Sequence, residues 1–253
     1  MLFKFKPEHM NLLTHLITPD WPAPATVKAL QTTRKGGVSV SPYASFNLGS
    51  HVGDNPLAVS RNRMLLAPLL PSEPVWLNQT HGLTIVDVAQ AGCLPEADAS
   101  VSSHPGAVCV VMTADCLPIL LCDEQGSVVG AAHAGWRGLC DGVIESTVNA
   151  MKVPAPTLMA WLGPAIGPTR FEVGYEVRAA FVAKQPQAAA AFMPVADGKW
   201  LADLYQLARL RLNALGVTRV YGGGLCTYSD PERFYSYRRD GVTGRMGTFI
   251  WLS

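Results

Sequence analysis

Residues 108–138 read VCVVMTADCLPILLCDEQGSVVGAAHAGWRG. Two apolar runs in this stretch, Val108–Thr113 and Leu117–Leu121, have the length and composition of buried strands. A third run, Val128–Ala132, leads into the glycine-flanked sequence HAGWRG. Three such runs in close succession predict that this stretch forms the centre of the protein.

Chemically active side chains stand where these strands are expected to end. Asp115 and Cys116 separate the first two runs. The third run delivers His133, and Arg137 follows four residues later. Each of these groups costs free energy to bury without a partner. We therefore interpret them as a site that the remainder of the chain supports.

The composition is typical of a well-packed enzyme. Of 253 residues, 49% are hydrophobic and 15% are charged, so the chain can bury a large core. Its 20 basic and 19 acidic residues give a formal net charge of +1. This balance leaves no basic excess for binding nucleic acid.

The sequence predicts neither a membrane span nor a signal peptide. The longest apolar runs are interrupted well before the ~20 residues that a membrane helix needs. The N-terminal stretch MLFKFKPEHMNLL has lysines but no continuous apolar segment followed by small residues. We therefore expect a cytoplasmic protein with no membrane partner and with reduced cysteines. Cys109, Cys122 and Cys140 are expected in the core, whereas Cys116 has polar and charged neighbours.

Further elements are expected on both sides of the central stretch. Strands are predicted at residues 27–33, 75–79, 83–89, 157–162, 234–239 and 248–252, and helices at 56–66, 139–151, 172–184 and 201–215. The strands outnumber the helices and do not alternate strictly with them, which favours an α+β fold with mixed sheets. No proline- or serine-rich linker divides the chain, so we expect a single domain over residues 1–253.

Three residues far apart in the sequence form the sharpest candidate site. His81 falls in a predicted tight turn, and Cys116 and His133 follow or end strands. Two imidazoles and a thiol match one known ligand set of catalytic zinc, which leaves a fourth position open. The same residues could form a Cys/His nucleophile pair without a metal, or a core thiol with two hydrogen-bonded histidines. The sequence alone leaves these three readings open.

Several common catalytic templates are excluded because their defining parts are missing. The sequence contains no GxxxxGK[ST], GxGxxG, HExxH or GxSxG motif. The HxE and PCxxC pair of zinc nucleobase deaminases is also missing.

Candidate substrate-binding residues lie in polar, glycine-containing segments. The aperiodic loop at residues 41–56, SPYASFNLGSHVGDNP, is long for a compact domain and is expected to be functional. Its Asn47 could hydrogen-bond a substrate or form an Asx turn. Arginine guanidinium groups suit phosphate or carboxylate, or pair with surface acids. Five arginines are placed for this, with Arg63 and Arg137 the strongest candidates: Arg34, Arg63, Arg137, Arg238 and Arg239.

The motifs together resemble one known family. The chain contains TTRKGGVS, SPYASFNLGSHVGDNP with NR downstream, WLNQTHG, MTADCLPIL, AAHAGWRGL, WLGPAIGP, FEVG and YSYRRDGVTGRMGTFIWL. In this order they resemble the bacterial laccase-domain family, the YfiH-like multicopper polyphenol oxidoreductases. The likeness spans nearly the whole chain, with no departure at a motif position.

The resemblance implies a fold, a metal site and activities. The family fold is α+β, with layered mixed sheets inside and helices outside. Its metal ligands correspond here to His81, Cys116 and His133, with zinc as the expected ion and copper as an alternative. The family is also associated with phosphorolysis of adenosine, inosine, guanosine and methylthioadenosine, and with adenosine deamination. The implied partners are a purine nucleoside and phosphate.

The residues favour phosphorolysis over laccase chemistry. A multicopper laccase needs a blue-copper site and a trinuclear cluster held mostly by further histidines. The chain has only six histidines, at positions 9, 15, 51, 81, 104 and 133. Three of the six lie outside every candidate segment. A zinc-assisted reaction with arginine-held phosphate needs only the groups present. Asp115 would then orient a ligand or act as a general acid or base, or else cap its turn.

Three rival functions remain as hypotheses. A metal-independent thiol hydrolase or amidase would use Cys116 as its nucleophile. Copper-dependent phenol oxidation would use the same three ligands. A non-enzymatic metal-binding module is less favoured, because closed structural sites use four protein ligands.

Overall fold

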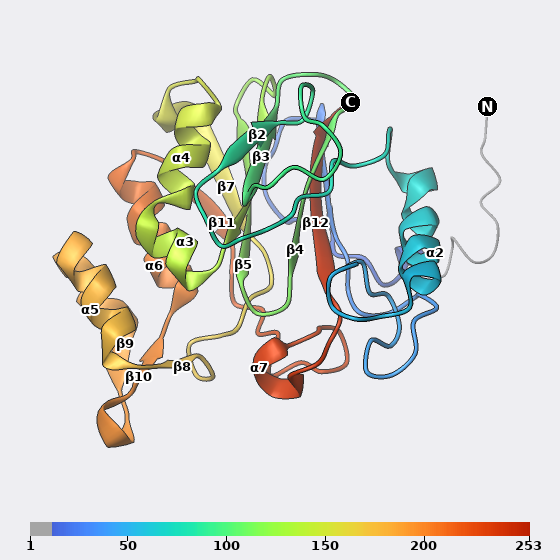
Figure 1. Cartoon of the computed structure of the whole chain (residues 1–253). Helices are drawn as coiled ribbons and strands as arrows, with labels where there is room; N and C mark the ends of the chain where they lie inside the picture. Colours follow the sequence, from blue (N-terminus) through green and yellow to red (C-terminus); the bar gives the residue numbers. More distant parts are fainter. Residues whose placement is uncertain (1–11) are drawn as a thin grey trace.

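A computed structural model describes residues 12–253 (Figure 1). Most of the N-terminal stretch in which no signal peptide is expected lies outside the described residues. Within residues 12–253, no helix is long and apolar enough to cross a membrane.

A mixed six-stranded sheet forms the middle of the molecule. Its strands follow the order β11-β7-β5-β6-β3-β2. In chain order they are β2 Ile85–Asp87, β3 Ala99–Ser102, β5 Leu117–Asp123, β6 Val129–Ala134, β7 Leu158–Leu162 and β11 Arg219–Gly222. The pairs at the two edges are parallel and the inner pairs are antiparallel. Because β5 and β6 are buried throughout, they read as continuous apolar runs.

A second, antiparallel sheet packs against one face of the first. It has the order β1-β12-β4, with β1 Val27–Gln31, β4 Val108–Thr113 and β12 Met246–Leu252. Val111 and Ile250 from this sheet share one core cluster with Leu120 and Ala131 from the larger sheet. The chain therefore passes from one sheet to the other between β4 and β5, at residues 114–116.

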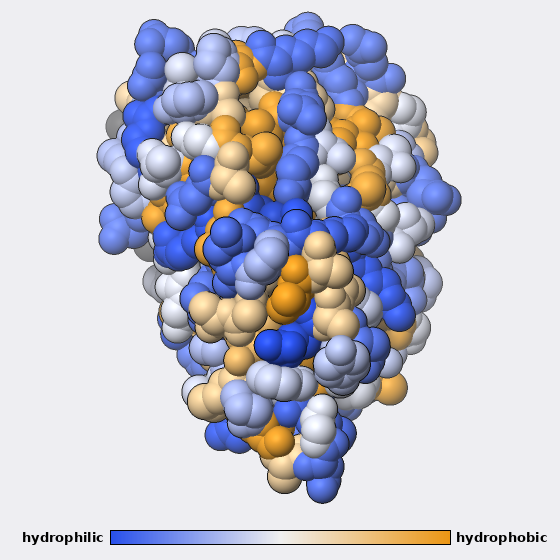
Figure 2. All heavy atoms as spheres, turned by 90° about the vertical axis from the view of Figure 1, so that its left-hand side faces the viewer, coloured by the Kyte–Doolittle hydropathy of each residue, from blue (hydrophilic) through white to orange (hydrophobic). Residues whose placement is uncertain are grey.

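Helices cover the outer faces of both sheets (Figure 1). On the six-stranded sheet lie α3 Trp136–Asp141, α4 Val143–Ala150 and α6 Leu204–Ala214, and α5 Tyr175–Lys184 packs outside them against α3. On the smaller sheet lies α2 Pro56–Leu66, whose Leu66 packs beside Val108 and Phe249. Seen from the α5 side, polar residues separate several apolar patches (Figure 2). The layered α+β fold expected from the sequence is confirmed.

Smaller elements complete the chain. A third sheet contains β8 Glu172–Val173, β9 Phe192–Pro194 and β10 Trp200–Ala202. A short helix, α7 Tyr237–Asp240, precedes β12. Single 3-10 turns occupy Ala67–Leu69, Ala155–Thr157, Pro186–Ala191 and Ala196–Gly198.

Five predicted elements are corrected by the structure. The helix expected at residues 139–151 begins at Trp136 and is broken at Gly142, whose φ of 116° ends α3. The strand expected at 234–239 is instead helix α7, because the Ser236 side chain accepts a hydrogen bond from Arg239 N. Residues 75–79 form only isolated bridges. Residues 172–173 and 201–202 are strand rather than helix.

Asp123 closes the turn between β5 and β6. Its carboxylate accepts hydrogen bonds from Ser127 N at 2.7 Å, Ser127 Oγ at 2.7 Å and Val128 N at 3.0 Å. Burial raises the pKa of Asp123, but these hydrogen bonds together lower it by more than burial raises it. The pKa therefore lies below its usual value. The ionised form therefore stabilises the hairpin that carries His133.

We expect Asp123→Asn to destabilise the protein at pH 7 by about 1–3 kcal/mol, because the amide nitrogen cannot accept these bonds. The pKa of Asp123 is lowered on folding, so its contribution is present above the unfolded-state pKa and is lost as the pH falls through the folded-state value. Urea unfolding of both proteins between pH 7 and pH 3 should show the difference shrinking below about pH 4. An unchanged difference at low pH would contradict this assignment.

Candidate functional site

Three donor side chains meet where the two sheets adjoin. His81 sits in the turn before β2 with a left-handed backbone, φ 62°. Cys116 directly precedes β5, and His133 lies on β6. The antiparallel register pairs Leu117 with Ala134 and Pro118 with His133, which brings Cys116 to the same end of the sheet as His133. Asp115, with φ 94°, turns the chain toward this end.

The distances within this group suit a metal ion. Cys116 Sγ lies 3.7 Å from His81 Nε2. The His81 and His133 ring centroids are 4.7 Å apart in an edge arrangement. One donor atom from each of the three residues lies within 4.8 Å of the others. Since zinc sits about 2.0–2.3 Å from nitrogen and sulfur ligands, one ion could contact all three.

Gly135 allows the three side chains to approach each other. A Cβ atom built at this position would lie 2.7 Å from His81 Cδ2 and 3.2 Å from Cys116 Sγ. A real Cβ cannot come this close, so any larger residue would displace the imidazole. The glycine in HAGWRG therefore has a packing function at the site.

Asp98 joins two of the donor residues, and the sequence analysis did not identify it. Its side chain is fully buried just before β3. It accepts hydrogen bonds from the backbone N–H groups of Thr80, His81 and Gly82 at 3.0, 2.9 and 2.6 Å. Its Oδ1 also lies 2.8 Å from His133 Nδ1. One carboxylate thus fixes the turn that carries His81 and the orientation of the His133 ring.

Charges in this group support one another. Burial alone would raise the pKa of Asp98, but hydrogen bonds from His133, Gly82 and Thr80 lower it to about 2. Burial would also raise the pKa of Cys116, yet the charge and hydrogen bonds of the two imidazoles lower it well below its usual value. In turn, burial lowers the pKa of His133, and the Cys116 and Asp98 charges outweigh that effect and raise it. The protein itself therefore favours a thiolate at Cys116 beside a protonated imidazole at His133.

The three donors open into a cavity of about 380 Å³. This volume lies within the usual range for small-molecule sites. The cavity is lined by His51, Gln79, His81, Met112, Thr113, Ala114, Cys116, His133, Tyr237 and Arg245. The sequence analysis placed the three donors, but not His51, Tyr237 or Arg245, in the site. His51 lies in the loop at residues 41–56 that was expected to be functional, so this loop could have pointed to His51 as a site residue.

Asp115 and Asn47 are both engaged within the protein. Asp115 accepts hydrogen bonds from Thr227 Oγ1, Ser236 Oγ and Arg238 N at 2.6, 3.0 and 2.7 Å. Its carboxylate thus ties the chain before Cys116 to the C-terminal segment. Asn47 is fully buried, and all its hydrogen-bonding atoms have protein partners. Neither residue lines the cavity.

Arg63 and Arg137 lie outside this cavity. Arg63 stacks on Trp76 at 3.7 Å and donates two hydrogen bonds to Leu48 O. It lines a neighbouring cavity of about 410 Å³. The Arg137 guanidinium lies 4.9 Å from the Trp136 ring centroid.

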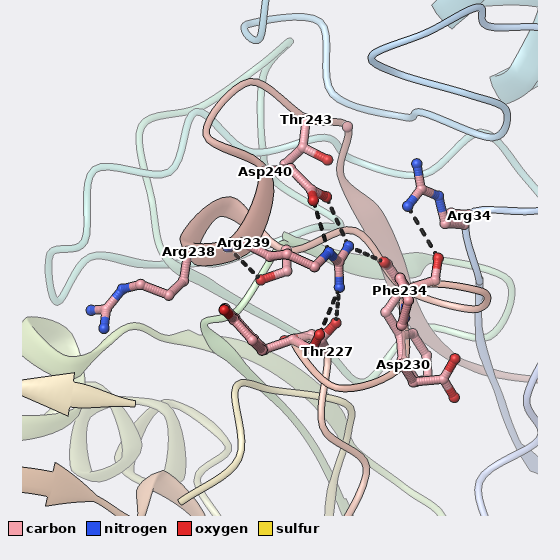
Figure 3. Close-up of polar contacts among 12 residues, drawn as sticks. Arg34, Thr227, Asp230, Phe234, Arg238, Arg239, Asp240 and Thr243 are labelled. Atoms are coloured by element: carbon pink, nitrogen blue, oxygen red, sulfur yellow. Dashed lines mark hydrogen bonds and ion pairs between the residues drawn. The ribbon is translucent and has the colours of Figure 1, made fainter. Parts of the chain in front are cut away.

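The other three candidate arginines hold the C-terminal segment together (Figure 3). Arg239 donates to the carbonyl oxygens of Thr227, Tyr228 and Phe234 and forms an ion pair with Asp240. Arg34 donates to Ala44 O and Pro231 O. Arg238 donates to Glu172 O.

The comparison with known families agrees with the motifs and the site. Residues 28–253 match the family model described as multi-copper polyphenol oxidoreductase laccase. The chain belongs to this family. The resemblance expected from the motifs is thereby confirmed, and the match includes all three donor residues.

Similar proteins cover nearly the whole chain. A Pseudomonas aeruginosa protein named purine nucleoside phosphorylase PA4543 is 57% identical over 93% of this chain and 98% of its own length. The Escherichia coli protein named purine nucleoside phosphorylase YfiH is 55% identical over 95% of this chain and 100% of its own length. The crystal structure of the Neisseria meningitidis protein NMB0706 is similar with a TM-score of 0.92 and 55% identity, covering 94% of this chain and 99% of that one.

We expect Asp98→Asn to weaken metal binding about 10- to 100-fold, as for other residues that orient metal ligands. Both carboxylate oxygens of Asp98 accept hydrogen bonds. The side-chain nitrogen of an asparagine at this position would therefore face an N–H donor in either orientation of the amide. Competition titration with a zinc chelator would measure the change. Asp141→Asn, at an exposed ion pair with Lys184, is the matched control and should bind zinc like the wild type. Equal zinc affinity in folded Asp98→Asn would contradict the role of Asp98.

Proposed function

We propose that the protein is a purine nucleoside phosphorylase that uses His81, Cys116 and His133. The observation that carries this proposal is the open cavity beside three convergent N and S donors. Two relatives that share more than half of the sequence are named purine nucleoside phosphorylases. The proposed substrates are adenosine, inosine, guanosine and methylthioadenosine, together with phosphate.

The proposed reaction exchanges one bond at the sugar. A phosphate oxygen forms a bond to C1′ of the ribose as the bond from C1′ to N9 of the base breaks. The bonding electron pair leaves with the base, which takes up a proton. The products are the free base and ribose 1-phosphate. A second proposed activity, adenosine deamination, replaces the 6-amino group by an oxygen from water and releases ammonia.

The three donors are the proposed ligands of a zinc ion, with copper as the alternative. Zinc bound there would supply Lewis-acid polarisation of an oxygen at the open position. Asp98 accepts a hydrogen bond from His133 Nδ1–H, which leaves His133 Nε2 for the cavity side. Cys116 contributes a thiolate, because its pKa is lowered by the neighbouring imidazoles.

The walls of the cavity can hold an aromatic base. Met112 and the exposed ring of Tyr237 provide apolar surface. The Gln79 amide is engaged with both the N–H and the carbonyl of Met112, so it serves as a fixed wall. These features suit a planar purine.

A second candidate is a metal-independent thiol hydrolase or amidase. The specific observation that favours it is the chain of contacts from Asp98 to His133 to Cys116, which is the arrangement of a nucleophile, a base and an orienting acid. Copper-dependent phenol oxidation is less supported. Among residues 12–253, these three donors are the one group of ligand-type side chains close enough to hold a metal, and a trinuclear copper cluster needs further histidines.

We expect purified protein to convert adenosine and phosphate into adenine and ribose 1-phosphate. Cys116→Ala should lower the rate by at least about 100-fold, the usual scale for loss of a catalytic group. Cys226→Ala is the matched control, because Cys226 does not line the cavity. Chromatography of the bases with and without phosphate measures the reaction. A Cys116→Ala protein as active as Cys226→Ala would overturn the proposal.

Metal removal separates the two candidates. Under the proposed function, chelation should abolish phosphorolysis, and added zinc should restore it. Under the thiol-hydrolase alternative, chelation would leave activity intact, whereas alkylation of Cys116 would abolish it. Activity that requires copper and no phosphate, with a thiolate-to-copper absorption band, would favour phenol oxidation.

A further inference from the structure

We propose that the guanidinium of Arg245 is an oxyanion subsite in the catalytic cavity and that it binds inorganic phosphate. The naming of phosphate rests on the proposed function above. Arg245 directly precedes β12, and its side chain lines the same cavity as Cys116 and His133. A bound oxyanion would therefore share the cavity with the reacting sugar.

One edge of the Arg245 guanidinium is free. Its Nη1 group donates to Thr243 O at 3.1 Å and to Gly244 O at 3.0 Å. Within residues 12–253, Nε and Nη2 have no hydrogen-bond acceptor, and no carboxylate forms an ion pair with this arginine. The Nε and Nη2 hydrogens lie side by side and fit two oxygens of a phosphate in a bidentate contact.

An unpaired cation in a partly enclosed position points to a missing anion. Partly buried charges are normally paired, because desolvation is costly. Among residues 12–253, four of the thirteen arginines form ion pairs with carboxylates, namely Arg211, Arg219, Arg233 and Arg239, and the other nine, Arg245 included, do not. Arg245 has none but faces a cavity, which is where a ligand anion could replace the missing carboxylate.

The loop that contains Asn47 holds this arginine in place. Asn47 Oδ1 accepts a hydrogen bond from Arg245 N at 2.8 Å, and Leu48 N donates to Arg245 O at 3.1 Å. Asn47 Nδ2 in turn donates to Asp54 Oδ2 at 3.0 Å. A Cβ at Gly49 would lie 2.8 Å from Arg245 Cγ, so only glycine leaves room for the arginine stem. Asn47 and Gly49 are thus positioning residues for Arg245.

The neighbouring side chains His51 and Arg63 are less suited than Arg245 to bind an anion in this cavity. His51 lines the cavity, and burial together with the charges of Arg245 and Arg63 lowers its pKa. The lowered pKa favours the neutral imidazole, so His51 offers no fixed positive charge to an anion. Arg63 donates hydrogen bonds from Nε and Nη2 to Leu48 O, whereas the same edge of Arg245 has no protein acceptor among residues 12–253. Of these groups, Arg245 is therefore the one able to bind an anion directly in the catalytic cavity.

The kinetic test compares Arg245→Met, Arg245→Lys and Arg61→Met. Arg61 is exposed and lines neither cavity, so Arg61→Met controls for loss of a positive charge. We expect Arg245→Met to raise the KM for phosphate at least about tenfold while changing the KM for adenosine less than about threefold. Arg245→Lys should be intermediate, because it keeps the charge but loses the bidentate edge. A phosphate KM in Arg245→Met equal to that of Arg61→Met would overturn the proposal.

A binding test keeps the inference separate from the proposed function. Inorganic phosphate should raise the Tm of the wild type and of Arg61→Met, but not that of folded Arg245→Met. This result would support the subsite even if no nucleoside were cleaved. Equal Tm increases in wild type and Arg245→Met would overturn it.

Adenosine 5′-monophosphate tests the alternative source of the anion. If Arg245 binds free phosphate, the nucleotide should compete with phosphate no better than sulfate does. If the nucleotide raises the Tm through Arg245 and inorganic phosphate does not, the subsite serves a substrate phosphate group and the assignment to inorganic phosphate is wrong.

Discussion

The buried carboxylate of Asp98 is the interaction on which the site depends. The carboxylate is fully buried. Hydrogen bonds from three backbone N–H groups of one turn and from the ring of His133 offset the cost of its desolvation. An isolated buried carboxylate would be unfavourable by several kcal/mol, so the turn at residues 80–82 must stay in contact with β6. This requirement holds His81 in a left-handed conformation and brings its ring to Cys116. Contacts within the protein therefore hold the three donor side chains close together.

The passage between the two sheets supplies the rest of the site. Residues 114–116 leave β4 in one sheet and enter β5 in the other, so side chains here lie at an end of both layers. Asp115 turns the chain and binds the C-terminal segment through Thr227, Ser236 and Arg238 N. The segment that carries Tyr237 and Arg245 is thereby brought to Cys116. Residues separated by more than 100 positions thus meet in one cavity.

The sequence predicted what short-range patterns determine. The apolar runs 108–113 and 117–121 correspond to β4 and β5, and α2 spans residues 56–66, as expected. Gly142 was missed because a glycine within an apolar helical pattern does not reveal whether its φ will be positive. Asp98 was missed because its partners lie 16 to 35 residues away. The free edge of Arg245 could not be predicted, because it depends on which backbone carbonyls accept hydrogen bonds from Nη1 in the folded loop.

The charges of the cavity explain why an arginine without a carboxylate partner is stable there. Asp98 and the Cys116 thiolate contribute two negative charges, which a divalent cation on the three donors would neutralise when bound. Cys116 and Asp115 act on Arg245 electrostatically, but neither forms an ion pair with it. A carboxylate paired with Arg245 would neutralise it and occupy the bidentate edge. The protein instead anchors this arginine through carbonyl oxygens, which fix its orientation without neutralising it, so the positive charge stays available to an incoming anion.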